Sequence, residues 1–231
     1  MYQRYAIYYC PRPDSVLWAR GSQWLGRCAV RQQQLQVPAI AGLSEEVTLE
    51  ITRDPRRYGW HATLKAPFAL VPGTTESMLR EALRSLAQGT KSFDIPVLQV
   101  QDLGHFLALV PQVASDKLNA LAAKCVTELH DFAAPLTDSE LARRRRSQLS
   151  PRQDTLLIQW GYPYVLDEFR FHYSLTSDLR DMTASQREYI VTAATKWFDN
   201  LSPQRFDSLA LVAEPKPGAD FVVLEHADLA P

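Results

Sequence analysis

Two tetrapeptides, at residues 61–64 (HATL) and 172–175 (HYSL), share one pattern: a histidine, any residue, a hydroxyl residue and leucine. Imidazole exchanges a proton near neutral pH, and a hydroxyl can hydrogen-bond an anionic oxygen beside it. A pattern that occurs twice predicts two acid/base groups and two anchors around one anion. These are the groups needed to cleave a phosphodiester without a metal.

Each tetrapeptide lies in a run typical of a β-strand, 60–68 for the first and 169–176 for the second. Successive side chains of a strand point to opposite faces, so each histidine should share a face with its hydroxyl residue. Either motif alone is common in proteins; the pair is the stronger signal. The four site residues predicted in this way are His61, Thr63, His172 and Ser174.

Cations flank both motifs. In a regular strand Lys65 lies on the face of the first pair, and Arg170 on the face of the second. Both are therefore candidate ligands for a substrate phosphate. A solvated sheet edge is the equally open alternative for these two side chains.

A dense charge run covers residues 143–146, all arginine. On a helix such a run fans around most of the circumference, so the favoured interpretation is a solvated helix. The alternative is that one or two of them, Arg143 and Arg144 first, fold over the cleft and bind a terminal phosphate bidentately. Because the segment joins the two halves of the chain, it could act as a lid.

Composition narrows the function classes. The 231 residues carry 25 basic and 26 acidic side chains, a balance that argues against a protein coating long nucleic acid. No signal-peptide pattern or membrane-length apolar run is seen, and three cysteines are scattered, so we expect a cytoplasmic protein without membrane contact. No glycine-rich phosphate loop, nucleophile elbow or zinc signature is present, and neither metal nor cofactor is expected.

The elements that must position the motifs follow from periodicity and capping signals. Both halves run motif strand, helix, strand, strand, so we expect an α+β fold: two pseudo-symmetric β-α-β-β lobes with antiparallel sheets around a central cleft, plus a helical insertion. One bilobal domain would contain lobe one (about 1–112), helices and insertion (about 113–165) and lobe two (about 166–231). Strands are expected at 5–9, 60–70, 93–103, 106–110, 169–176, 206–213 and 221–224; helices at 14–25, 74–89, 115–132, 138–148, 151–160 and 183–201; and mostly loop at 31–56.

Longer strings around the motifs carry a family resemblance: YGWHATLKAPF at 58–68, SPRQ at 150–153, WGYPYV at 160–165 and EFRFH at 168–172. With the paired motifs they resemble the two-histidine phosphoesterase superfamily, which includes RNA 2′-5′ ligase-like proteins and cyclic phosphodiesterases. The resemblance is closest to a bacterial branch encoded beside phosphonate-degradation genes of the carbon–phosphorus lyase type, and it covers nearly the whole chain.

The resemblance implies that His61 and His172 are the acid/base pair and that Thr63 and Ser174 anchor the phosphate. The second motif has serine where many relatives have threonine, which keeps the hydroxyl. The branch implies a role in phosphonate metabolism, in which a ribose cyclic phosphate must be opened.

Together these observations favour a metal-independent phosphodiesterase that opens a small cyclic phosphate on a phosphorylated sugar or nucleotide. Two alternatives stay open: a phosphodiesterase or ligase acting on 2′-5′ or 2′,3′-cyclic RNA ends, and a non-catalytic protein that binds a nucleotide or an RNA end. Which histidine is the acid and which the base is also open at this point.

Overall fold

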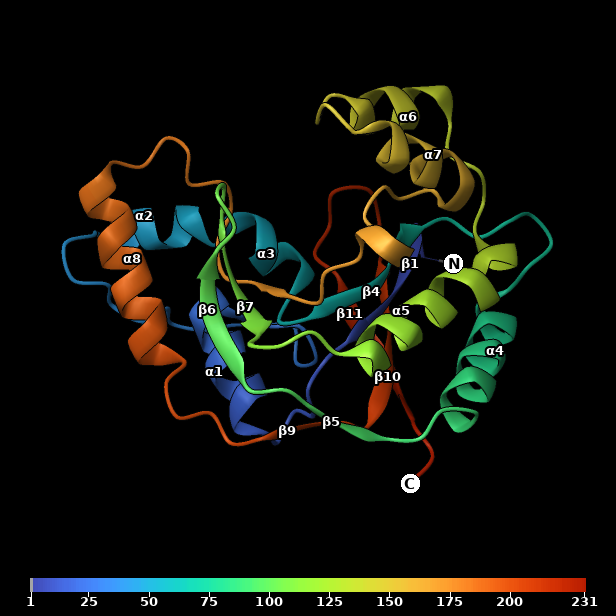
Figure 1. Cartoon of the computed structure of the whole chain (residues 1–231), viewed down its shortest axis with the longest axis horizontal. Helices are drawn as coiled ribbons and strands as arrows, with labels where there is room; N and C mark the ends of the chain where they lie inside the picture. Colours follow the sequence, from blue (N-terminus) through green and yellow to red (C-terminus); the bar gives the residue numbers. More distant parts are fainter. Residues whose placement is uncertain (1) are drawn as a thin grey trace.

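The computed structural model describes residues 2–231, which form one seven-stranded sheet with helices packed around it (Figure 1). The strands of this sheet are β1 (Arg4–Tyr9), β4 (Ala62–Phe68), β6 (Leu98–Asp102), β7 (Leu107–Pro111), β8 (Tyr173–Ser174), β10 (Ser208–Glu214) and β11 (Val222–Asp228). Their order is β11-β10-β1-β4-β8-β7-β6, and every pairing is antiparallel. Two-stranded sheets join β2 (Arg27–Cys28) to β3 (Gln33–Gln34) and β5 (Phe93–Ile95) to β9 (Gln204–Phe206).

The helices begin where side-chain caps predict. Thr137, Ser150 and Thr183 each form a capping box, in which the side chains of the first and fourth residues bind each other's backbone N–H groups. The helices are α1 (Val16–Leu25), α2 (Glu45–Ile51), α3 (Arg53–Tyr58), α4 (Glu76–Gln88), α5 (Asp116–Glu128), α6 (Asp138–Arg145), α7 (Pro151–Trp160) and α8 (Ala184–Trp197), with 3₁₀ turns η1 (His130–Phe132) and η2 (Leu166–Glu168).

The expected α+β class and antiparallel sheet are confirmed, but the strands are exchanged between the halves. The pair β6–β7 follows the first motif in the chain, yet it lies beside β8. The pair β10–β11 follows the second motif, yet it lies beside β1 and so on the β4 side. The proposed lobes at about 1–112 and about 166–231 are contiguous in sequence, whereas each half of the sheet draws strands from both.

Three sequence-based expectations were wrong in detail. Residues 31–56 contain α2 and most of α3, because Ser44 caps a short helix that the weak apolar pattern hides. The expected strand 93–103 is broken after β5, where Pro96 has no N–H for a ladder. The expected strand 169–176 shrinks to β8, because the carbonyls of Phe169 and Arg170 accept hydrogen bonds from side chains instead of from a neighbouring strand.

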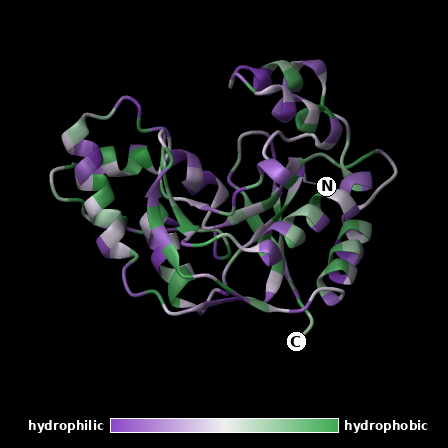
Figure 2. Ribbon diagram, in the orientation of Figure 1, coloured by the Kyte–Doolittle hydropathy of each residue, from purple (hydrophilic) through white to green (hydrophobic). Residues whose placement is uncertain are grey.

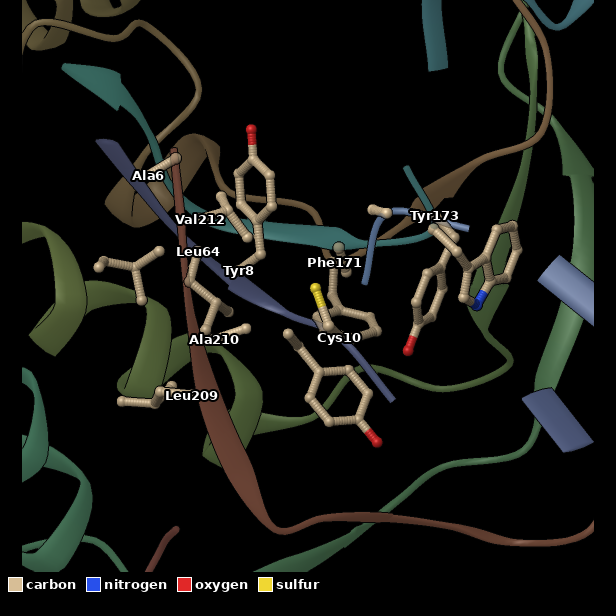
Figure 3. Close-up of a cluster of buried hydrophobic side chains, with 14 of the residues drawn as sticks. Ala6, Tyr8, Cys10, Leu64, Phe171, Tyr173, Leu209, Ala210 and Val212 are labelled. Atoms are coloured by element: carbon tan, nitrogen blue, oxygen red, sulfur yellow. The ribbon is translucent and has the colours of Figure 1, made fainter. Parts of the chain in front are cut away.

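The core lies where the two motif strands meet at the centre of the sheet, at the pair Ala62 and Tyr173. Trp60 stacks between Tyr173 and Phe198, with ring centroids 4.7 and 5.3 Å away and nearly parallel planes. Figure 3 shows part of this cluster around Tyr173, Phe171 and Cys10. This packing holds the two backbone segments that carry His61 and His172.

Helices cover the sheet unevenly. α4 packs against β10 and β11, α5 against β4, and α8 against β6, while α6 and α7 stand apart from the sheet at the top of Figure 1. Hydrophobic residues follow the strands in Figure 2, and hydrophilic residues dominate α6. None of the helices in residues 2–231 has the length and apolarity needed to cross a bilayer.

Candidate active site

Both motifs open onto one cleft of about 610 Å³. The cleft is bounded by the start of β4, the segment before β8, α3 and the turn before β7, with part of the α6–α7 insertion on its rim. The structure brings together His61, Thr63, His172 and Ser174, which all line this cleft.

The two imidazole rings are held by the same kind of local hydrogen bond. Nδ1 of His61 lies 2.8 Å from the carbonyl oxygen of Gly59, and Nδ1 of His172 lies 2.7 Å from that of Arg170. In each case the partner is two residues earlier in the chain. Because a carbonyl only accepts, Nδ1 carries the hydrogen, and Nε2 is left to exchange a proton with a ligand.

Burial favours the neutral form of both rings. It lowers the pKa of His61 from 6.5 to about 4; the hydrogen bond to Gly59 opposes this change and the charge of His172 adds to it. Burial also lowers the pKa of His172, again opposed by its carbonyl partner. The repulsion between the rings means that the site accommodates one imidazolium more readily than two.

Gly59 has a conformation that only glycine adopts readily. Its φ of 80° and ψ of −178° place it outside the regions open to other residues. A Cβ at this position would lie 2.5 Å from the Cβ of Ala29. The carbonyl that orients His61 is therefore placed by a backbone turn that no other residue type could make without strain.

Thr63 and Ser174 line the cleft together with the two histidines. On β4 and β8 they are two residues beyond the histidines, as the strand periodicity predicts. Each can donate a hydrogen bond to an anionic oxygen that sits between the two imidazoles.

The prediction that Lys65 shares the face of His61 is wrong. A β-bulge intervenes: Tyr8 pairs with Thr63 and Ile7 with Lys65, so Leu64 is an extra residue and the alternation of β4 is shifted. Lys65 is 4% exposed, its Nζ donates to the carbonyl of Val126 at 3.2 Å, and it lines a different hollow.

The other three predicted cations differ in their position relative to the cleft. Arg170 is exposed at the rim of the cleft, where its guanidinium donates to the carbonyls of Asp167 and Phe169. Arg143 is exposed and does not line the cleft. Arg144 does line it, with its guanidinium 5.3 Å from the ring centre of Tyr162 and its Nε buried without a partner among residues 2–231.

An aromatic wall on one side of the cleft was missed by sequence reasoning. The ring of His61 stacks on Tyr8 with centroids 4.0 Å apart and lies 5.8 Å from Tyr58. Tyr162 and Tyr164 continue the wall toward Arg144. Part of the signal was present in the sequence, where Tyr58 precedes Gly59 and tyrosines flank Pro163, but nothing in the sequence alone placed these rings together.

A metal-binding cluster is not part of this arrangement. Within residues 2–231, no three histidine, cysteine, aspartate or glutamate side chains come together in a way that could hold an ion. The cleft lining offers imidazoles, hydroxyls, guanidiniums, tyrosines and the carboxylates of Asp54, Glu168 and Asp178.

A family model described as "Protein of unknown function (DUF1045)" matches residues 63–222. A protein named "Ribose 1,5-bisphosphate phosphokinase PhnN" from Janthinobacterium sp. (strain Marseille) is 40% identical over 222 residues, which is 95% of this chain and 49% of that protein. One of the same name from Laribacter hongkongensis (strain HLHK9) is 36% identical over 218 residues, 94% of this chain and 50% of that protein. The chain spans about half the length of the curated relatives it matches.

Solved structures with a similar course of the backbone include E. coli LigT complexed with 3'-AMP, at a TM-score of 0.45 and 13% identity over the full length of both chains. Another is a structure named only as a phosphoesterase, at a TM-score of 0.45 and 14% identity over 99% of each chain. The function of the present chain has to be argued from its own cleft.

Proposed function

The chain belongs to the family described as protein of unknown function (DUF1045), and we propose that it opens the cyclic phosphate of a small phosphorylated ribose by metal-independent acid/base catalysis. One observation carries the proposal: two imidazoles with the same Nδ1–carbonyl hydrogen bond, each with a hydroxyl residue two positions on, line one cleft.

The proposed reaction needs two proton transfers. Nε2 of the neutral histidine takes a proton from the attacking water as the new P–O bond forms. Nε2 of the protonated histidine gives its proton to the ribose oxygen as the old P–O bond breaks, and the product is a phosphomonoester. Each transfer contributes roughly 10²–10⁴-fold to the rate.

Thr63 and Ser174 would donate hydrogen bonds to the non-bridging oxygens of the phosphate, where negative charge accumulates. Donors already aimed at that position stabilise the transition state without reorganising. The anionic diester would also favour a proton on one imidazole, because an opposite charge nearby raises the pKa that burial has lowered.

His172 is the better candidate for the protonated partner. His61 is stacked on Tyr8, and its pKa is lowered to about 4, so it is the ring that stays neutral most readily. The His172 ring has Phe106 as its aromatic neighbour within residues 2–231, at a centroid distance of 5.8 Å. We therefore assign the base in the ring-opening direction to His61 and the acid to His172.

A second phosphate on the substrate would be bound by Arg144. This guanidinium lies over Tyr162 at the rim and has an unpaired Nε, and burial lowers its pKa while leaving it a strong base. The name of the relatives refers to a doubly phosphorylated ribose, which supports a substrate of this class. Since this chain has no glycine-rich phosphate loop, we assign it phosphodiester opening and not the phosphokinase activity.

The test compares kcat/KM for three substrates: a ribose 5-phosphate 1,2-cyclic phosphate, a nucleoside 2′,3′-cyclic phosphate and a short RNA with a cyclic end. We expect the sugar to be the best substrate. Arg144→Met should raise its KM about tenfold, the loss of one charged hydrogen bond, and leave kcat largely intact. The matched control is Arg143→Met, because that exposed neighbour does not line the cleft.

A different ranking would overturn the substrate assignment. If the RNA is preferred and its binding falls steeply with salt, the protein acts on RNA ends. If none of the three substrates turns over while a nucleotide still binds, the cleft is a binding site only.

Metal independence is tested separately. We expect full activity after exhaustive chelation and dialysis, since the proposed groups need no ion to exchange protons. Activity that disappears on chelation and returns with a divalent cation would contradict the mechanism while leaving the substrate assignment intact.

A further inference from the structure

A second hollow, of about 200 Å³, lies between β4, α5, η1 and the α6–α7 insertion. None of the histidines that line the cleft lines this second hollow. The two hollows share lining residues at Ala66, Pro67, Tyr162 and Val165, so they lie back to back.

Three nitrogen groups in this hollow lack the partners that buried polar groups normally have. The ammonium of Lys65, 4% exposed, has one acceptor, the carbonyl of Val126. His130 Nδ1 and Trp160 Nε1 are buried with no hydrogen-bond partner within the described residues 2–231. The rings of His130 and Trp160 meet edge to face with centroids 4.9 Å apart. Buried donors left unpaired cost free energy, which a ligand that accepts from them would recover.

Within residues 2–231, no carboxylate in the lining of the hollow balances the charge of this group, although Asp131 acts on His130 from outside the lining and opposes the lowering of its pKa. Burial lowers the pKa of Lys65 to about 8, against a smaller opposing effect of Cys125 on α5. Burial and the charge of Lys65 together lower the pKa of His130. No aspartate or glutamate is among the residues that line the hollow in the described part of the chain. A single cation with two further nitrogens is thus surrounded mostly by apolar side chains.

We propose that this hollow binds a small organic monocarboxylate, with its two oxygens accepting from Lys65 and Trp160 and its apolar body against the surrounding side chains. The indole N–H only donates, and a carboxylate only accepts, so their chemistry is complementary. One ammonium balances one negative charge. A dianionic phosphate monoester would leave a charge uncompensated in an apolar site, which is costly.

The lining sets the size and nature of the apolar body. Val126, Leu136, Leu157 and Val165 contribute aliphatic side chains, and Phe68 lies under the ammonium at 5.2 Å. A protein cavity of about 150 Å³ lined by such residues is enough for benzene. Benzoate, which carries one ring and one carboxylate, is therefore the natural probe.

Titration calorimetry on the unmodified protein tests the proposal by measuring the affinity for three probes that share one aromatic ring. The probes are benzoate, its neutral analogue benzamide, and dianionic phenyl phosphate. Benzoate should bind at one site per chain, and benzamide about tenfold more weakly because the charged hydrogen bond is lost. Phenyl phosphate should not compete for this site. Equal affinity of the unmodified protein for benzoate and benzamide would overturn the proposal.

Variants locate the site. Lys65→Met should reduce benzoate affinity by about tenfold or more, and the milder Trp160→Phe, which removes only the N–H, by roughly threefold to tenfold. The matched control is Lys196→Met, an exposed lysine on α8. The double variant His61→Ala/His172→Ala should bind benzoate as the unmodified chain does. Loss of binding in that double variant would place the probe in the catalytic cleft instead, and unchanged binding in folded Lys65→Met or Trp160→Phe would contradict the assignment.

Discussion

The two histidine half-sites make the same hydrogen bond on different scaffolds. His61 precedes the seven-residue strand β4, is stacked on Tyr8 and takes its carbonyl partner from Gly59, a residue at positive φ. His172 precedes the two-residue strand β8, lies 5.8 Å from an aromatic ring and takes its partner from Arg170. The symmetry of the site therefore lies in the ring geometry, not in the packing around it.

This difference suggests how one pair of identical side chains can have two roles. A tightly packed ring is poorly hydrated and stays neutral, while a ring with fewer neighbours can gain a proton when an anion arrives. Changes of matched residues in the two half-sites test whether the difference in packing sets the two roles.

The largest effect is expected from the rings themselves. His61→Ala and His172→Ala should each lower kcat by roughly 10²–10⁴-fold, and the double variant should lose little more, because the two rings serve one transition state. The control is His105→Ala, which removes a third cleft imidazole that has no hydroxyl two residues on. Near-normal turnover in either single variant would show that the half-sites are not a functional pair.

The second largest effect on kcat is expected from the two hydroxyls. Thr63→Val and Ser174→Ala should each lower kcat by about 10²-fold, the usual cost of removing one donor to a developing anion. Thr63→Ser and Ser174→Thr keep the donor and should retain most activity. A large loss on one side only would indicate that the phosphate is bound asymmetrically, closer to one half-site.

Gly59 tests the scaffold of the first half-site. In Gly59→Ala the new Cβ would meet Ala29, so the carbonyl that orients His61 should move, and displacements of this kind can lower kcat by about 10-fold to 10²-fold. The backbone strain should also destabilise the fold by about 1–3 kcal/mol. Gly73→Ala is the matched control, because Gly73 has a φ of 92° but open space around it. It should cost stability and spare kcat; an equal loss of kcat in both variants would rule out a role for the Gly59 carbonyl.

The smallest effect is expected on the pH dependence of folding stability. The folded-state pKa of His61, about 4, lies below its ordinary value of 6.5. In that window the unfolded chain binds a proton that the folded chain does not, so stability falls as pH drops from 6.5 toward 4. Urea unfolding near pH 7 and pH 5 should show a decrease about 1–2 kcal/mol larger in the unmodified protein than in His61→Asn. Parallel decreases would mean that His61 is hydrated in the free protein.

Sequence periodicity located the parts of the site that depend on local chain geometry. The hydroxyls of Thr63 and Ser174 follow their histidines by two residues, which is enough to place them on one side of a strand. The capping boxes before α6, α7 and α8 fixed those helix starts for the same reason. Such features need only the nearest few residues.

Other features depend on partners distant in sequence. The bulge that turns Lys65 away from the cleft arises from pairing with β1, and nothing in the local sequence marks it. The aromatic wall around His61 also depends on a tertiary contact, the stacking of its ring on Tyr8 of β1. The exchange of strands between the two halves is another property of the assembled sheet, because both arrangements have the same order of elements.

That exchange has a consequence for how the chain folds during synthesis. Among the strands of residues 2–231, β1 is made before the others, but it sits between β4 and β10, and β10 is made only after β8. β8 is also made late and joins the two halves of the sheet. Neither half can therefore close while the nascent chain is short, and contacts of this long range make folding slow. Translation speed and chaperones should affect the yield of this protein more than that of a chain whose halves each fold from a contiguous segment.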